Sequence, residues 1–162
     1  MTQENKNIPK TRRILVAFYS RDGHTKRIAE ILAESLNADI DEIKDKKSRK
    51  GLIGFFKAGC DATLGKTTEI AFSKNPANYD IVVVGSPVWN GRVTPAVRTY
   101  LLKNKDRIKK IAFYVTCVGR QGKALLQMHE IYISDPLTEK VILRSSEIKG
   151  VKQFIESLKS VV

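Results

Sequence analysis

The chain has 162 residues, which suits one domain with a single core, and its 42% hydrophobic content excludes wholesale disorder. Lysine and arginine total 29 against 17 acidic residues, giving a formal charge of +12. No apolar run approaches the roughly 20 residues of a membrane span, and the two cysteines, Cys60 and Cys117, lack metal-ligand spacing. The polar start has no signal-peptide core, so we expect a cytoplasmic protein without a membrane span or a metal site.

The first part of the chain predicts a strand, a helix and a second strand. Residues 1–12 are expected to form a flexible basic leader, followed by a single domain over 13–162. The continuous β-branched and aromatic run at 13–19 predicts a buried strand. Apolar residues at helical spacing predict a helix over 24–36, and polar-apolar alternation over 39–43 predicts a half-buried or edge strand.

A basic segment follows. Residues 44–57 contain six lysines and arginines, with Asp45 as the only acid. We interpret 44–69 as a crossover helix, while a lid or a dimer surface stays open as an alternative. A second basic stretch lies at 103–110. Such surfaces attract acidic proteins, nucleic acids or anionic membranes. No nucleic-acid motif accompanies them, so we expect no dedicated nucleic-acid partner, and a solvated basic face is the simpler interpretation.

The remaining elements continue the alternation of strands and helices. They are a central strand at 79–85, a helix opened by Thr94 as N-cap and Pro95, a strand at 111–116, a helix at 122–131, a strand at 141–143 and a last helix at 151–162. Five strands with intervening helices predict an α/β fold, with an open parallel sheet covered by helices on both faces.

In such a sheet, ligands bind beyond the carboxyl ends of the strands, where the strand order reverses. The loops expected to meet there are 20–25, 86–93 and 117–122. The first loop, Ser-Arg-Asp-Gly-His-Thr, sets hydroxyls and a glycine at the start of a helix. Backbone N–H groups and the positive end of the helix dipole face one small volume there, so the loop suits a phosphate group.

The other two loops suit a flat ring. The second carries Trp89, the only tryptophan of the chain, next to the turn-forming pair Asn90-Gly91. Its ring suits stacking on a planar ligand, and packing on the neighbouring helix is the structural alternative. In the third loop, Gly119 and Gly122 allow the backbone to approach a ligand closely. The three loops together predict a site for a planar ring linked to a phosphate.

These residues resemble the flavodoxin family over about residues 13–160. Ser20 to Thr25 is similar to that family's Ser/Thr-x-x-Gly-x-Thr phosphate loop, Gly85 to Gly91 to its second flavin loop, and Cys117 to Gly122 to its third. The resemblance implies a three-layer α-β-α sandwich with a five-stranded parallel sheet in the order 2-1-3-4-5. It also implies flavin mononucleotide, FMN, as the cofactor.

The resemblance implies a role for each loop. Hydroxyls and amides of the first loop hold the phosphate, Trp89 stacks on the flavin ring, and the Asn90-Gly91 peptide lies near flavin N5. The third loop contacts the pyrimidine edge through its backbone, starting at Thr116. The implied cofactor-binding residues are Ser20, Arg21, Asp22, Gly23, His24, Thr25, Ser86, Pro87, Val88, Trp89, Asn90, Gly91, Thr116, Cys117, Val118, Gly119 and Gly122. No catalytic residue of the protein itself is implied, because the flavin does the redox chemistry.

The function this implies is electron transfer between protein or small-molecule partners. An NAD(P)H-dependent quinone or flavin reductase of the same class is one alternative, and a flavin-free binding module is another. The chain departs from carrier flavodoxins in its basic charge, with Arg92 and Arg120 inside the flavin loops. Positive charge there favours the anionic reduced flavin, an acidic redox partner or an anionic substrate. Both a monomer and a homodimer are compatible with the sequence.

Overall fold

The computed structural model describes residues 12–47 and 51–161. Apart from Arg12, the predicted leader lies outside the described residues. The main sheet contains five parallel strands in the order β2-β1-β5-β7-β8. They are β1 (Ile14–Phe18), β2 (Asp39–Glu42), β5 (Ile81–Trp89), β7 (Ile111–Cys117) and β8 (Glu139–Leu143). This is the predicted order 2-1-3-4-5, with β2 at an edge as its alternating sequence indicates.

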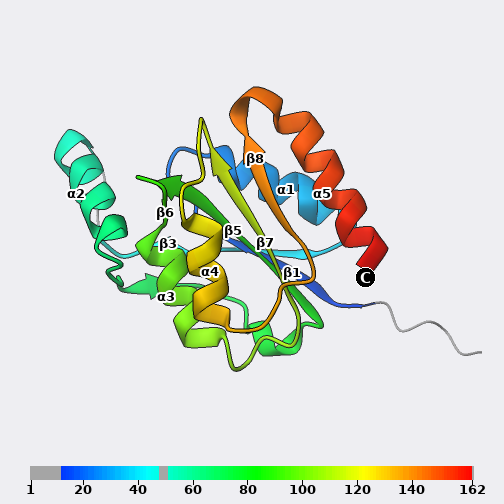
Figure 1. Ribbon diagram of the computed structural model, residues 1–162. Helices are drawn as coiled ribbons and strands as arrows, with labels where there is room; N and C mark the ends of the chain where they lie inside the picture. Colours follow the sequence, from blue (N-terminus) through cyan, green and yellow to red (C-terminus); the bar gives the residue numbers. More distant parts are fainter. Residues whose placement is uncertain (1–11, 48–50, 162) are drawn as a thin grey trace, which may run out of the picture.

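Helices cover both faces of the sheet, which confirms the three-layer sandwich (Figure 1). On one face, α1 (His24–Leu36) and α5 (Glu147–Val161) pack on side chains such as Val83 and Tyr114. On the other face, α3 (Pro95–Asn104) and α4 (Ala124–Tyr132) pack on side chains such as Val82 and Val84. Because successive residues of β5 point to opposite faces, its Ile-Val-Val-Val run supplies both cores.

The predicted loop at 86–93 is wrong in part, because most of it continues the strand. β5 extends to Trp89 and turns back into β6 (Arg92–Val93), with Val88 paired to Val93 and Trp89 to Arg92. Asn90 and Gly91 have φ of 49° and 69°. Positive φ at both central residues defines a type I′ turn, which matches the twist of a two-residue hairpin and favours Asn-Gly. The turn chemistry was visible in the sequence, but the pairing was not.

The basic segment contains structure that the sequence did not predict. β3 (Lys44–Asp45) pairs antiparallel with β4 (Ile70–Ala71), forming a small second sheet. Between them, α2 (Gly51–Thr63) is part of the crossover from β2 to β5, as expected. It nevertheless stands at the side of the molecule, where it contacts β5, β6 and α3, and not over the middle of the sheet (Figure 1). Short 3₁₀ turns, η1 (Pro76–Asn78) and η2 (Arg144–Ser146), precede β5 and α5.

The described residues contain neither a membrane-spanning helix nor a cluster of metal-binding side chains. None of their helices has the length and apolarity needed to cross a membrane. Across 12–47 and 51–161, no three His, Cys, Asp or Glu side chains gather in a way that could hold a metal ion.

Candidate functional site

The loop at 20–25, predicted to bind a phosphate and called the phosphate loop below, is held in shape by its own side chains. Gly23, with φ of 89°, stands at the N-cap of α1, and its N–H donates to Ser20 Oγ at 3.1 Å. The N–H of His24 donates to Asp22 Oδ1 at 3.3 Å. The next two amides, those of Thr25 and Lys26, lie in the first turn, where no carbonyl of the helix can accept from them. The positive end of the α1 dipole therefore keeps donors for an anion.

Below this loop, two hydrogen bonds made by hydroxyl groups fix the start of α1. Thr25 is buried, and its Oγ1 lies 2.9 Å from Thr116 Oγ1, so two predicted site residues bond to each other. The hydroxyl of Tyr114 donates to the carbonyl of Thr25 at 3.3 Å. Tyr114 reaches it across Gly85, where an added Cβ would lie 2.1 Å from the ring. Gly85 is thus required for close packing under the phosphate loop.

The second and third loops interlock through two glycines. Gly122 has φ of 56°, and a Cβ there would lie 2.5 Å from both Cα and O of Gly91. The N–H of Lys123 donates to the Gly91 carbonyl at 2.7 Å. On its other side, the hairpin is tied to α2, because Asn90 Nδ2 donates to Thr63 Oγ1 at 2.7 Å. The turn that the resemblance places near flavin N5 is therefore held from both sides.

Trp89 is half-buried beside the phosphate loop. Its ring meets Tyr19 edge to face, with centroids 5.5 Å apart and an interplanar angle of 84°. The guanidinium carbon of Arg21 lies 6.0 Å from the Trp89 ring centroid, within cation–π range. A planar ligand that stacks on the ring face covered by Arg21 must therefore displace that guanidinium or stack on it.

A pocket of about 440 Å³ lies where the three loops meet, a volume within the usual range for small-molecule sites. Nine of its ten lining residues are predicted cofactor-binding residues: Arg21, Asp22, His24, Pro87, Val88, Trp89, Thr116, Cys117 and Val118. The tenth is Arg144. The structure thus brings together segments that are almost a hundred residues apart in the sequence.

Arg144 and Glu147 were missed in the sequence. Arg144 follows β8, and its Nη2 lies 3.3 Å from Asp22 Oδ2. Glu147 opens α5 and contacts both His24, at 3.2 Å to Nδ1, and Arg27, at 2.6 Å. The carboxyl end of the fifth strand points to the same edge as the other strand ends, which was the available signal.

His24 and Cys117 titrate in environments set by burial. Burial lowers the pKa of His24, and Arg144 and Arg27 lower it further, against the opposing effect of Glu147 and Asp22. His24 Nε2 is buried and has no hydrogen-bond partner among the described residues. Burial also raises the pKa of the Cys117 thiol, whose sulfur donates to the Gly119 carbonyl at 3.5 Å. At neutral pH both side chains are therefore held uncharged.

Some predicted residues do not line this pocket. Ser86 is fully buried, and its hydroxyl donates to the Pro87 carbonyl at 2.9 Å and lies 3.2 Å from Thr94 Oγ1. Thr94 occupies the predicted N-cap of α3, but its side chain makes no capping bond. Arg92 and Arg120 are also outside the lining, so the cations at the pocket are Arg21 and Arg144. The other predicted residues outside the lining are Ser20, Gly23, Thr25, Asn90, Gly91, Gly119 and Gly122.

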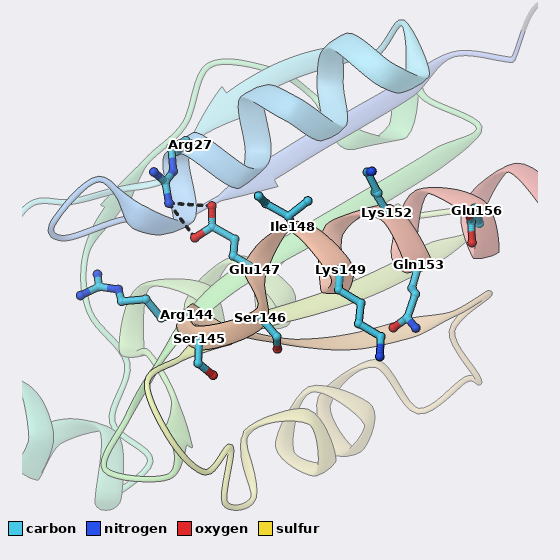
Figure 2. Close-up of a pocket in the computed structure, with 10 residues that line it drawn as sticks. All are labelled: Arg27, Arg144, Ser145, Ser146, Glu147, Ile148, Lys149, Lys152, Gln153 and Glu156. Carbon is cyan, nitrogen blue, oxygen red and sulfur yellow. Dashed lines mark hydrogen bonds and ion pairs between the residues drawn. The ribbon is translucent and has the colours of Figure 1, made fainter.

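A larger hollow, of about 770 Å³, lies elsewhere, along the outer side of α5 next to α1. Figure 2 shows Arg27 and Glu147 facing each other there, while Ser145, Ser146 and Lys149 point away from Arg27. Both carboxylate oxygens of Glu147 lie 2.6 Å from Arg27 Nη2. Several side chains that line this hollow point away from one another, and the charges of Arg27 and Glu147 already neutralise each other. We therefore place the candidate site at the strand ends and not in this hollow.

The chain is similar in fold to solved structures of flavoproteins. The chain is similar to a flavoprotein from Lactobacillus acidophilus NCFM in complex with FMN, with a TM-score of 0.71 and 22% identity over 86% of this chain and 98% of that chain. The fold is flavodoxin-like. Oxidised flavodoxin 1 from Bacillus cereus is similar with a TM-score of 0.55 and 14% identity, covering 93% of this chain and 99% of the flavodoxin.

Similarity in sequence covers a smaller part of the chain than similarity in fold. A curated NAD(P)H dehydrogenase (quinone) from Cupriavidus metallidurans is 27% identical over 89 residues. That match spans 55% of this flavodoxin-like chain and 45% of the dehydrogenase, so the chain covers less than half the length of this relative. No family model matches the sequence.

Proposed function

We propose that this chain is a redox protein that binds FMN at the strand ends and passes electrons between partners. The proposal rests above all on the pocket of about 440 Å³, where residues of three separate loops meet as the predicted flavin site requires. The likeness in fold to the FMN-bound flavoprotein of Lactobacillus acidophilus supports the choice of FMN.

The phosphate end fits an anion. The amides of Thr25 and Lys26 and the dipole of α1 attract negative charge, and Arg144 adds a cation at the rim. Asp22 now accepts the N–H of His24, a bond that a phosphate oxygen would take over. The carboxylate would then swing toward Arg144, which already lies 3.3 Å from it.

The ring end fits a planar group. Trp89 and Val88 offer an aromatic and an apolar surface, and the backbone at Thr116 to Val118 offers polar groups in the same pocket. When bound, the flavin supplies the redox chemistry. Arg21 and Arg144 contribute positive charge, which stabilises an anionic reduced ring more than a neutral oxidised one. We therefore expect a higher reduction potential than in an acidic carrier, and acidic proteins or small anionic molecules as partners.

The second candidate function is an NAD(P)H-dependent quinone reductase. It is favoured by the partial likeness to the quinone dehydrogenase of Cupriavidus metallidurans. A reductase needs space for a second planar molecule near the flavin, whereas a carrier needs only an exposed flavin edge.

Stepwise anaerobic reduction of the FMN-loaded protein, followed by visible spectroscopy, tests the proposal. A carrier is expected to accumulate a one-electron-reduced species and to oxidise NAD(P)H only slowly. A protein that passes directly to the two-electron-reduced form, and turns over NAD(P)H with a quinone, is the reductase. A protein that stays colourless after incubation with FMN overturns both and supports the flavin-free binding module.

A further inference from the structure

A second pocket lies on the α2 side of Trp89. Its volume is about 390 Å³. Phe56, Ala58 and Gly59 of α2 form one wall, and Val88 and Trp89 of β5 form the other. Arg21, Val88 and Trp89 line both this pocket and the candidate flavin pocket, so the two pockets are neighbours around one indole ring. Four of its eight lining residues, Arg21, Val88, Trp89 and Asn90, belong to the predicted flavin site, whereas Phe56, Ala58, Gly59 and Cys60 do not.

Gly59 suggests that this space serves a ligand. It lies inside α2, where glycine is less favourable than alanine. An added Cβ would meet no heavy atom of the described residues within 4 Å, so packing does not require a glycine. Gly59 lines the pocket, so a larger residue at this position would reduce the open space there. The absence of a side chain at Gly59 therefore lowers the stability of the helix and leaves the pocket open.

The lining defines the chemistry of the occupant. Two aromatic side chains, Trp89 and Phe56, border the pocket, and the Phe56 side chain is 71% exposed. Aromatic rings favour a planar apolar partner through stacked or edge contacts. Arg21 adds a guanidinium at the edge of the same space, which favours a negatively charged group on that partner. Few polar groups around an apolar cavity are typical of small-molecule sites.

We propose that the pocket between α2 and Trp89 binds a small planar aromatic molecule that carries an acidic group. Its ring lies between Phe56 and Trp89, and its acid faces Arg21. This binding does not depend on flavin. A role as the small-molecule partner of the redox reaction does rest on the proposed FMN site, because the two pockets meet at Trp89.

The test is isothermal titration of 2-naphthoate, and of uncharged 2-naphthalenemethanol, into the full chain with and without FMN. We expect saturable binding of both compounds in both states, with 2-naphthoate bound at least threefold more tightly. Arg21→Gln is expected to remove this preference, and Arg107→Gln, a cation that bonds to Asn75 away from the pocket, is its matched control. Binding without FMN separates this inference from the flavin proposal.

Two variants of α2 test the position of the ligand. Phe56→Ala is expected to weaken binding of both compounds at least threefold. Leu64→Ala, which removes a 68% exposed side chain just beyond the end of the same helix, should leave it unchanged. Gly59→Ala should raise the Tm and weaken binding at least threefold, a combination that simple destabilisation cannot produce.

Three results would overturn the inference. The first is the absence of saturable binding of either compound. The second is binding that FMN abolishes, which would place the compound in the flavin pocket. The third is a fall in the sedimentation mass of Phe56→Ala relative to the parent, with naphthoate binding unchanged, which would assign this surface to a second copy of the chain.

Discussion

The two ends of the candidate flavin site are built differently. At the ring end, backbone meets backbone: Gly122 lies against Gly91, and Lys123 N–H donates to the Gly91 carbonyl at 2.7 Å. At the phosphate end, side chains hold the backbone, with Ser20 and Asp22 accepting the loop amides. Backbone contacts of this kind have no rotamers to change, whereas the side chains of Ser20 and Asp22 turn away by single bond rotations.

This difference predicts a preformed ring end and an adjustable phosphate end. Substitutions that enter the backbone contact should lower both stability and flavin affinity. Substitutions among the capping side chains should change affinity with a smaller effect on stability. The predictions below begin with the largest expected effect.

Gly85→Ala should remove the support beneath the phosphate end. The added Cβ would lie 2.1 Å from the fully buried ring of Tyr114, so the ring must move or the strand must bend. We expect the free energy of unfolding to fall by about 3 kcal/mol or more, measured by urea denaturation. Adding Tyr114→Leu, which removes the ring, should recover part of the lost free energy of unfolding. A double variant that is less stable than Gly85→Ala alone would contradict the explanation.

Gly122→Ala should disrupt the contact between Gly122 and Gly91 at the ring end of the site. It combines a left-handed backbone with a Cβ 2.5 Å from Gly91, so we expect a loss of about 2–4 kcal/mol in the free energy of unfolding. FMN affinity should fall at least tenfold. Gly119→Ala is the control for stability, since no heavy atom of the described residues lies within 4 Å of that Cβ. Equal losses of stability in the two variants would show that the contact between Gly122 and Gly91 does not matter.

Thr25→Val should cost stability more than affinity. Thr116 would lose its buried partner, so the free energy of unfolding should fall by about 1–2 kcal/mol. Thr25→Val/Thr116→Val should cost less than the sum of the single variants, because the pair is lost only once. FMN affinity should change less than threefold, since the Thr25 amide remains. A tenfold loss of affinity would instead assign the hydroxyl to the phosphate, as the family resemblance implies.

Asp22→Asn should strengthen FMN binding. The amide oxygen can still accept the His24 N–H, but a negative charge next to the phosphate is removed. We expect about three- to tenfold tighter binding at low salt, and a smaller gain at high salt because the loop is exposed. Glu30→Gln, an exposed acid further along α1, controls for net charge. Weaker binding of Asp22→Asn would show that the carboxylate shapes the loop in a way that an amide cannot.

The smallest expected effect is a dependence of stability on pH through His24. Burial, Arg144 and Arg27 lower its pKa in the folded chain below 6.5, its ordinary value. Between these two pKa values the unfolded chain binds more protons, so stability rises with pH and is lost as the pH falls through 6.5. His24→Gln should flatten this part of the profile in urea titrations from pH 5 to 7.5.

The sequence predicted the sheet better than it predicted the site. Continuous apolar runs such as Ile81 to Val84 mark strands buried on both faces, and the alternation at Asp39 to Glu42 indicates a half-buried or edge strand. The order of the strands was implied by the resemblance to the flavodoxin family. The pairing of β3 with β4 could not be seen, because two residues on each side carry no periodic signal.

The parts of the site that depend on long-range contacts were also hidden. Arg144, one of the two arginines at the pocket, follows the fifth strand of the sheet, whose end was not expected to contribute to the site, and Glu147 reaches His24 across more than a hundred residues. The hydroxyl of Thr25 was expected to face a phosphate, and its bond to Thr116 was not foreseen. Spacing along the chain identified which loops meet, but it could not tell which side chains would satisfy one another once the loops had met.

The most direct test of the account is to titrate the protein with FMN and with riboflavin while following the fluorescence of Trp89, the only tryptophan. A ring bound in the pocket quenches this fluorescence, and a phosphate bound at the start of α1 adds affinity. The account predicts quenching by both ligands, with FMN bound at least tenfold more tightly than riboflavin. Equal affinities, or no quenching by either ligand, would contradict a flavin phosphate site at Ser20 to Thr25.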